Sequence, residues 1–261
     1  MPVDYAVEDS VALLTLNRPE VLNAFDEEHG RALLEGLRKA AGDDSIRCIV
    51  ILGAGRAFSA GEDLGALQGI YESGSAPPLG DTLVNRYNPL VLAVRSAPKP
   101  VVAAVNGVAA GAGASLALAC DFRIASDKAK LSLAFIKVGL VPDSGGLWFL
   151  TRMVGVAKAW ELAALGDPID AAEALRLGIV NQVAAPEEFE AAWRAFAQRL
   201  AAGPTRAYAL TKSLANAAPE RSLAEQLELE VEAQTEAGKT QDHLEGIRAF
   251  LAKRAPDFKG R

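Results

Sequence analysis

Two glycine-rich turns, each placed after a short apolar run, are the first candidates for chemistry in this sequence of 261 residues. One covers residues 53–64 and the other covers residues 106–116. We expect each turn to join a strand to a helix, the first helix starting near Glu62, because leading helical N–H groups lack a partner and carry positive dipole charge. Small side chains would let a substrate reach the backbone itself. Two such turns facing one point would form an oxyanion hole for a carbonyl compound.

Each turn has less specific interpretations when it is taken alone. Glycine and alanine at a junction between strand and helix usually indicate only tight packing. A dinucleotide site is another interpretation, but Gly107, Gly111 and Gly113 do not have the Gly-x-Gly-x-x-Gly spacing, and no acidic residue follows at the appropriate distance.

Asp143 is a candidate acid or base. It lies between apolar residues, with Leu140 and Val141 before it and Trp148 and Phe149 after it. An apolar, partly closed site would raise its pKa from the ordinary value of about 3.9 toward neutrality. The alternative is that Asp143 only caps a helix beginning at the next residue, a common role of aspartate.

The elements that would position these residues can be predicted from the apolar pattern. Strands are expected at residues 11–16, 48–52, 100–105, 121–125 and 130–134, and a helix capped by Asp26 is expected to run to about residue 41. After Gly155 the pattern is almost wholly helical, with a long helix ending near Gly238. Residues 71–81 are loop-like, and we expect them to be mobile or to lie over a pocket. The order of elements indicates an α/β fold.

Composition excludes several classes of function. Half of the residues are apolar, which is enough for a core without disulfides or a structural metal. The net charge is −6 with no basic cluster, so a nucleic-acid partner is not expected. No apolar run reaches the ~20 residues of a membrane helix, and no export signal is visible. Cys48 and Cys120 lie in apolar runs and fit a reduced cytoplasmic protein, while His29 and His243 fit structural or surface positions on helices.

Four segments in order resemble the crotonase family of enoyl-CoA hydratases and isomerases. They are the two turns, residues 16–24 (Leu-Asn-Arg-Pro-Glu-Val-Leu-Asn-Ala) and residues 139–146 (Gly-Leu-Val-Pro-Asp-Ser-Gly-Gly). The resemblance implies a spiral of β-β-α units over residues 1–200. It also implies a C-terminal helical region, residues 201–261, that builds a homotrimer or a dimer of trimers. Coenzyme A would enter as part of an acyl-CoA substrate, so we expect neither a separate cofactor nor a bound metal.

The resemblance also implies site residues. The two oxyanion donors would be the backbone N–H groups of Glu62 and Ala112. Ala112 stands where many relatives have glycine, but the N–H donor survives that change. Contacts with coenzyme A and the acyl group would come from residues 16–24, from the two turns, from residue 135 and from the C-terminus of a neighbouring subunit. The residues are Arg18, Asn23, Ala24, Ala60, Gly61, Asp63, Leu64, Gly111, Phe135, Phe258 and Lys259.

The reaction class depends on the carboxylates. At the two places where hydratases of the family carry glutamates, this chain has Ser115 and Phe135, so hydration of an enoyl-CoA is not favoured and room is left for a bulky acyl group. Asp143 stands where certain double-bond isomerases carry their acid/base residue. Residues 140–146, 203–212 and 241–250 look like those of the phenylacetate-degradation branch, which isomerises ring 1,2-epoxyphenylacetyl-CoA to an oxepin. The expected function is therefore acyl-CoA isomerisation by Asp143, including shifts of enoyl-CoA double bonds.

Three other functions stay open at this point. One is residual hydratase-like activity. Another is aryl-CoA dehalogenation with Asp143 as nucleophile, although no histidine between His29 and His243 could activate the hydrolytic water. The third is a relative without catalytic activity that binds acyl-CoA or RNA, and the acidic composition argues against RNA.

Overall fold

The computed structural model describes all residues, 1–261, and contains two sheets. The larger sheet has the order β1-β2-β3-β5-β7-β10 and is parallel except for the antiparallel pair β1 and β2. The smaller sheet has the order β4-β6-β8-β9, with β9 antiparallel. The strands are β1 (Val3–Glu8), β2 (Val11–Leu16), β3 (Cys48–Gly53), β4 (Ala57–Ser59), β5 (Val101–Val105), β6 (Val108–Ala110), β7 (Phe122–Ser126), β8 (Lys130–Ser132), β9 (Ile169–Asp170) and β10 (Gln182–Ala184).

The chain repeats one step: a strand of the larger sheet, a strand of the smaller sheet, and then helical structure. The steps are β3 and β4 followed by α2, β5 and β6 followed by α5, and β7 and β8 followed by η3. This repetition is the β-β-α spiral, so the predicted fold class is confirmed. The helices are α1 (Glu27–Gly42), α2 (Gln68–Glu72), α3 (Leu79–Thr82), α4 (Asn88–Ser96), α5 (Ala112–Ala119), α6 (Gly146–Leu165), α7 (Ala171–Arg176), α8 (Pro186–Ala201), α9 (Thr205–Ala217), α10 (Leu223–Gly238) and α11 (Gln241–Leu251). Short helical turns are η1 (Pro19–Val21), the π-helical η2 (Leu83–Tyr87), η3 (Ala134–Val138) and η4 (Ala218–Glu220).

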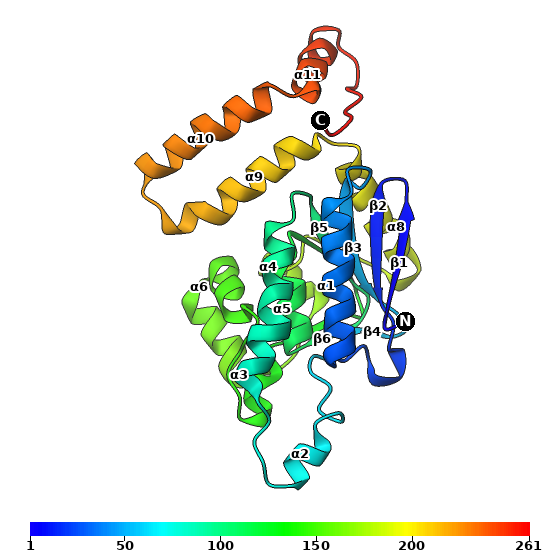
Figure 1. The fold of residues 1–261 in the computed structure, drawn as a ribbon, viewed down its shortest axis with the longest axis vertical. Coiled ribbons are helices and arrows are strands. Elements are labelled where there is room, and N and C mark those ends of the chain that lie inside the picture. The colour runs from blue at the N-terminus through cyan, green and yellow to red at the C-terminus, as the bar shows by residue number, and fades with distance from the viewer.

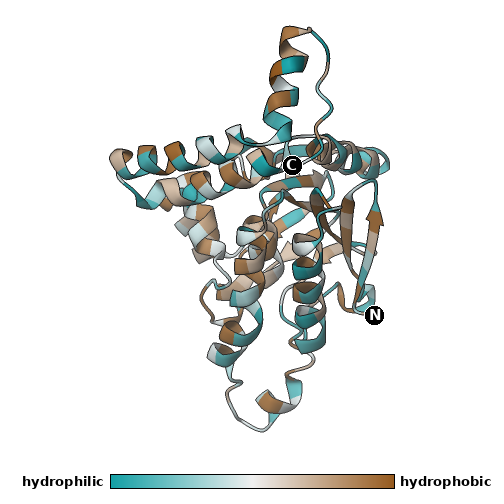
Figure 2. Ribbon diagram, turned by 45° about the horizontal axis from the view of Figure 1, so that its top comes forward, coloured by the Kyte–Doolittle hydropathy of each residue, from teal (hydrophilic) through white to brown (hydrophobic).

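The larger sheet is buried on both faces, which explains its continuous apolar strands. Ala12 and Leu14 point to the face covered by α1, α4 and α5, whereas Val11 and Leu13 point to the face covered by α8. Figure 2 shows the apolar strands at the centre of the molecule between these helices. On the α8 side, Trp193 lies against the sheet.

The C-terminal helices α9, α10 and α11 extend beyond the sheet at the end opposite α2 (Figure 1). Basic side chains connect this region to the core. Lys212 donates to Asp121 Oδ2 at 2.7 Å, and Arg47 donates to Thr205 Oγ1 at 3.1 Å and Phe258 O at 2.9 Å. Large apolar side chains on α10 and α11 are exposed, among them Leu223, Val231 and Phe250. The division at residue 200 and the homotrimer stay predictions.

The five expected strands and the first helix agree with the structure, and Asp26 accepts a hydrogen bond from the N–H of His29 as the N-cap. One expectation is wrong. No helix begins at Glu62; the chain there forms a turn, and the next helix begins at Gln68. The last third is almost wholly helical, as expected, and its two strands, β9 and β10, are too short to show alternation. No helix is both long enough and apolar enough to span a membrane.

Candidate active site

Ala112 is the first residue of α5, so its N–H has no partner within that helix. The turn from β6 into α5 is made by Gly111, whose φ of 52° and ψ of −126° belong to a region that favours glycine. The eight residues of α5 are all buried, which fixes the helix and its first N–H in the core. The expected strand-to-helix junction at the second turn is therefore present, and it presents the Ala112 N–H at a helix N-terminus.

The N–H of Glu62 is held by different means. Residues 61–63 pair with Phe25 as an isolated parallel bridge, in which Phe25 N donates to Gly61 O at 2.7 Å and Asp63 N donates to Phe25 O at 2.9 Å. This pairing prevents a helix from starting at Glu62. It leaves the intervening Glu62 N–H without a hydrogen-bond acceptor in the chain.

The two turns are in direct contact, and glycines make that contact possible. Gly61 has φ 92°, and a Cβ built on it would lie 2.8 Å from Ala110 O and 3.2 Å from Ala112 N. A Cβ on Gly113 would lie 2.4 Å from Ser59 O. The peptide groups of both turns thus approach more closely than any side chain would allow. Glu62 and Ala112 line one cavity.

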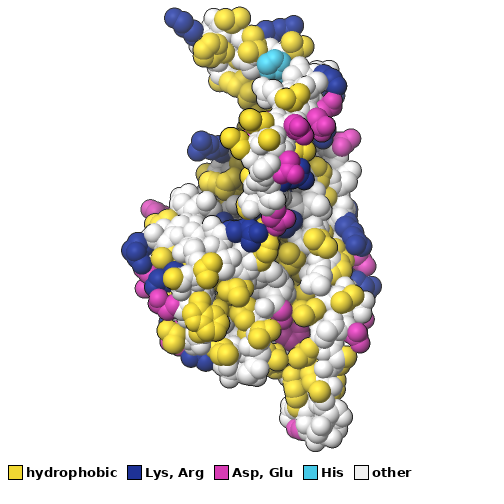
Figure 3. Space-filling model, turned by 90° about the vertical axis from the view of Figure 1, so that its left-hand side faces the viewer, with side chains coloured by type: hydrophobic (Ala, Val, Ile, Leu, Met, Phe, Trp, Pro, Cys, Tyr) yellow, Lys and Arg dark blue, Asp and Glu magenta, His cyan; other side chains and the backbone are white.

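That cavity has a volume of about 270 Å³ and a mainly apolar wall, formed by residues 60–71, 79–87, 111–112 and 134–143. Figure 3 shows hydrophobic side chains around a hollow in the lower part of the molecule, with acidic atoms in its depth. Tyr71 and Leu79 belong to the wall, so the loop-like segment lies over the cavity as expected. The size exceeds the ~150 Å³ that an apolar cavity needs to hold benzene.

Asp143 reaches this cavity and does not cap a helix. The helix α6 has Gly145 as its N-cap, without a side-chain cap, and the Asp143 carboxylate accepts one hydrogen bond, from Ser144 Oγ at 2.7 Å. Burial raises the pKa of the Asp143 carboxyl, the hydrogen bond from Ser144 opposes this, and the negative charge of Glu62 raises it further. No cation pairs with it. Asp143 is therefore a partly buried carboxylate without a paired cation.

Phe135 lies where it was expected, whereas Ser115 does not. Phe135 lines the cavity, whereas Ser115 is fully buried beneath it. Ser115 Oγ donates to Asp143 O at 3.0 Å. A Cβ on Gly146 would lie 2.4 Å from Ser115 Oγ. The space expected at Ser115 is thus filled by the Asp143 segment itself. Ser115 supports the Asp143 backbone, and the room expected there for an acyl group is absent.

A group of three interacting side chains was missed, of which Glu62 and Tyr87 line the cavity and Arg86 lies behind them. Glu62 Oε1 accepts from Arg86 Nη2 at 3.1 Å, and Glu62 Oε2 accepts from the hydroxyl of Tyr87. Burial and the neighbouring Glu62 charge raise the pKa of the Tyr87 hydroxyl, which keeps it a donor. Arg86 and Tyr87 lie on η2, more than twenty residues from Glu62, and no local pattern links them. A π-turn has no apolar periodicity by which a sequence could reveal it, although such turns are frequent at functional sites.

Several predicted coenzyme A contacts have structural partners of their own. Arg18 forms ion pairs with Asp26 and Asp63, each at 2.9 Å, and donates to Ala24 O at 2.8 Å. Asn23 is fully buried, and its amide donates to two carbonyls of the first glycine turn while accepting from Arg18 N. These contacts fold the segment 16–24 onto that turn.

The remaining predicted contacts divide between the cavity and the C-terminus. Ala60, Leu64 and Gly111 line the cavity. Phe258 and Lys259 lie at the other end of the chain, where Lys259 N donates to Asp242 Oδ1 at 2.6 Å and a Cβ on Gly246 would touch the Phe258 ring at 3.5 Å. In one chain they do not meet the site.

Comparison with known proteins agrees with this geometry. The family model described as enoyl-CoA hydratase/isomerase matches residues 6–261. The chain is 46% identical to the 1,2-epoxyphenylacetyl-CoA isomerase of Escherichia coli (strain K12) over 98% of this chain and 97% of that protein. It is 43% identical to a probable enoyl-CoA hydratase of Rhodobacter capsulatus, over 99% and 98%. The crystal structure of an enoyl-CoA hydratase from Polaromonas sp. JS666 superposes with a TM-score of 0.92 at 38% identity, over 98% and 99%. This chain is a member of the enoyl-CoA hydratase/isomerase family, the crotonase family.

Proposed function

We propose that this enzyme is an acyl-CoA isomerase in which Asp143 is the acid/base and the N–H groups of Glu62 and Ala112 form the oxyanion hole. The observation that carries the proposal is the set of polar groups in the cavity. Glu62 and Ala112, whose N–H groups we assign as the donors, line it, and Asp143 is a carboxylate there without a cation, whereas Glu62 is held by Arg86.

The chemistry follows from that arrangement. Hydrogen bonds from two N–H groups to the thioester oxygen stabilise the enolate, so a proton on the α- or γ-carbon becomes acidic. Asp143 removes that proton and the electron pair spreads over the conjugated dienolate. The same carboxyl group returns the proton to the carbon two bonds away, and the carbonyl re-forms. The substrate and product have equal mass, and Asp143 ends as a carboxylate.

We propose ring 1,2-epoxyphenylacetyl-CoA as the principal substrate. Opening of the bond between the two epoxide carbons gives a seven-membered oxepin while the oxygen stays bonded to both. The proton moves from the α-carbon to a ring carbon through Asp143. Support comes from the 46% identical isomerase and from a cavity wall that includes Phe135, Tyr71 and Tyr87, which can pack against a ring.

Hydration is less well supported by the site. It requires one group to activate water and another to protonate the α-carbon. Glu62 is the second carboxylate of the cavity, but Arg86 and Tyr87 donate to both of its oxygens. Neither oxygen is left free to activate water.

The test is a panel of acyl-CoAs with the purified protein: ring 1,2-epoxyphenylacetyl-CoA, straight-chain 3-enoyl-CoAs and crotonyl-CoA, followed by ultraviolet absorbance and product mass. We expect conversion of the epoxide and of 3-enoyl-CoAs without change of mass. Conversion of neither, or addition of water to crotonyl-CoA as the fastest reaction, would contradict the proposal.

A further inference from the structure

The two oxyanion donors differ in how the fold supports them. Ala112 begins a buried helix, and α5 with Gly111 fixes the direction of its N–H. Glu62 belongs to no helix or strand, so neither a helix axis nor a helix dipole orients its N–H. An oxyanion hole is effective only when its donors are held in place before the charge develops. The Glu62 peptide therefore needs another support.

The side chain of Glu62 supplies part of that support. Arg86 donates to Oε1 at 3.1 Å and Tyr87 donates to Oε2, so both carboxylate oxygens are fixed from η2. Tyr87 is only 4% exposed, and the side chains of Arg86 and Glu62 are 13% and 22% exposed. Hydrogen bonds to a charged group that is mostly shielded from water are stronger and more directional than surface pairs. The carboxylate accordingly acts as an anchor.

Arg86 also makes a contact with Phe25, the residue that pairs with the backbone on either side of Glu62. Its Nη1 donates to Phe25 O at 3.3 Å, and Phe25 O also accepts the N–H of Asp63. Phe25 N donates in turn to Gly61 O. The residues before and after Glu62 are thus tied to Phe25, and one guanidinium joins Phe25 to the Glu62 side chain.

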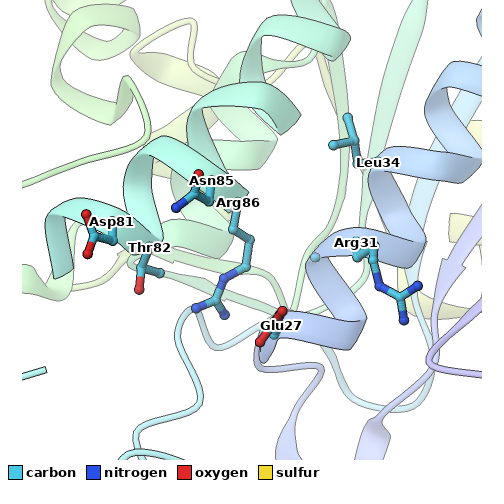
Figure 4. A pocket seen from close by; sticks show the side chains of 8 residues that line it. Glu27, Arg31, Leu34, Asp81, Thr82, Asn85 and Arg86 are labelled. Atoms are coloured by element: carbon cyan, nitrogen blue, oxygen red, sulfur yellow. The ribbon is translucent and has the colours of Figure 1, made fainter. Parts of the chain in front are cut away.

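Arg86 itself is held by close packing against α1. A Cβ added to Gly30 would lie 2.6 Å from both Cγ and Cδ of Arg86. The absence of a side chain at Gly30 therefore provides the space that the Arg86 side chain occupies. Figure 4 shows Arg86 extending from its helix to a position beside Glu27 of α1, at the edge of a polar pocket of about 320 Å³. Asn85 lines that pocket beside Arg86 but makes no hydrogen bond to the active-site wall.

We propose that Arg86 and Tyr87 are positioning residues that hold the Glu62 N–H in the direction required to bind the oxyanion, acting through the Glu62 side chain and Phe25. This inference rests on the proposed function only in assigning that N–H to the thioester oxygen. It assigns no proton transfer to Glu62. No hydrogen bond of the cluster reaches Asp143, which feels the cluster only through the negative charge of Glu62.

The probe is acetoacetyl-CoA, whose enolate absorbs in the near ultraviolet and carries the charge that the donors bind. The affinity for an alkyl-CoA thioether, which has no carbonyl, reports the binding contributed by the rest of the site. We expect the Tyr87→Phe and Arg86→Met variants to bind the enolate about tenfold or more weakly and to lose about 10- to 100-fold in kcat, short of the ~10²–10³ for complete loss of a donor. Affinity for the thioether should be unchanged.

Gly30→Ala tests the same idea without removing a polar group. Alanine favours the helix, so folding is retained, while the new methyl group displaces Arg86. We expect the same selective loss of enolate binding. The matched control is Asn85→Ala, on the same turn and facing the polar pocket, which should behave as the unaltered protein.

The outcomes separate this inference from the proposed function. Equal weakening of enolate and thioether binding, or unchanged enolate binding in all three variants, overturns the positioning role. Failure of the unaltered protein to bind acetoacetyl-CoA as its enolate also overturns it. If the unaltered protein binds the enolate, the variants lose it selectively, and no epoxide or 3-enoyl-CoA is converted, the inference stands and the proposed substrate class fails.

Discussion

Replacement of Asp143 by asparagine removes the proton acceptor and keeps the shape of the site. Asparagine can still accept from Ser144 Oγ, and the contacts that hold the segment use the backbone, since Ser115 Oγ and Gly146 N both bond to Asp143 O. Loss of general acid–base catalysis costs about 10²–10⁴ in rate, or about 3–5 kcal/mol in the barrier. In the proposed site the thioester is bound by backbone N–H groups that the substitution does not touch, so KM should change little.

The assay is steady-state isomerisation of a 3-enoyl-CoA and of the epoxide, with kcat and KM determined separately. Thermal unfolding should show that the variant is folded, within about 1 kcal/mol of the unaltered protein. The matched control is Asp127→Asn at a surface aspartate 44% exposed, which should leave kcat unchanged. A folded Asp143→Asn variant with unaltered kcat would refute the assignment of the base.

Further predictions concern the pH dependence, the glycine turn, the buried amide and the reaction class. Because burial raises the pKa of Asp143 and its charged form is the base, kcat/KM should fall with decreasing pH through a pKa above the ordinary ~3.9, as a pH profile will show. Gly61→Ala should reduce kcat by at least about 10², because its Cβ would press on Ala110 O and Ala112 N and separate the donors. Asn23→Ala should lower the free energy of unfolding in urea by about 2–4 kcal/mol, since it leaves buried carbonyls and an N–H unpaired. Hydration of crotonyl-CoA should be at least about 10²-fold slower than isomerisation, measured by loss of enoyl absorbance.

The sequence predicts those parts of the site that depend on local chemistry. The strands before the two turns are short and β-branched, and glycine marks the places where the backbone approaches itself, so the turns and the fold class follow from the pattern. The helix N-terminus at Ala112 follows in the same way. Asp143 stands in an apolar segment, which is enough to suggest a raised pKa.

The parts that the sequence does not reveal depend on contacts between distant residues. A helix at Glu62 is plausible locally, but Phe25, more than thirty residues away, pairs with residues 61–63 and prevents it. The ion pair of Glu62 with Arg86 depends on how η2 packs against α1. The sequence predicts space at Ser115, because no local pattern reveals that Gly146 packs against this side chain.

The central claim is that one carboxylate carries a proton between two carbons of a bound dienolate. The most direct test is a single turnover, in ordinary water, of a 3-enoyl-CoA that carries deuterium at the α-carbon, with the label in the product located by NMR. We predict that a substantial fraction of the deuterium appears at the γ-carbon, because Asp143 delivers what it removed inside a mainly apolar cavity. Rapid conversion to a product with no deuterium at the γ-carbon would contradict the claim.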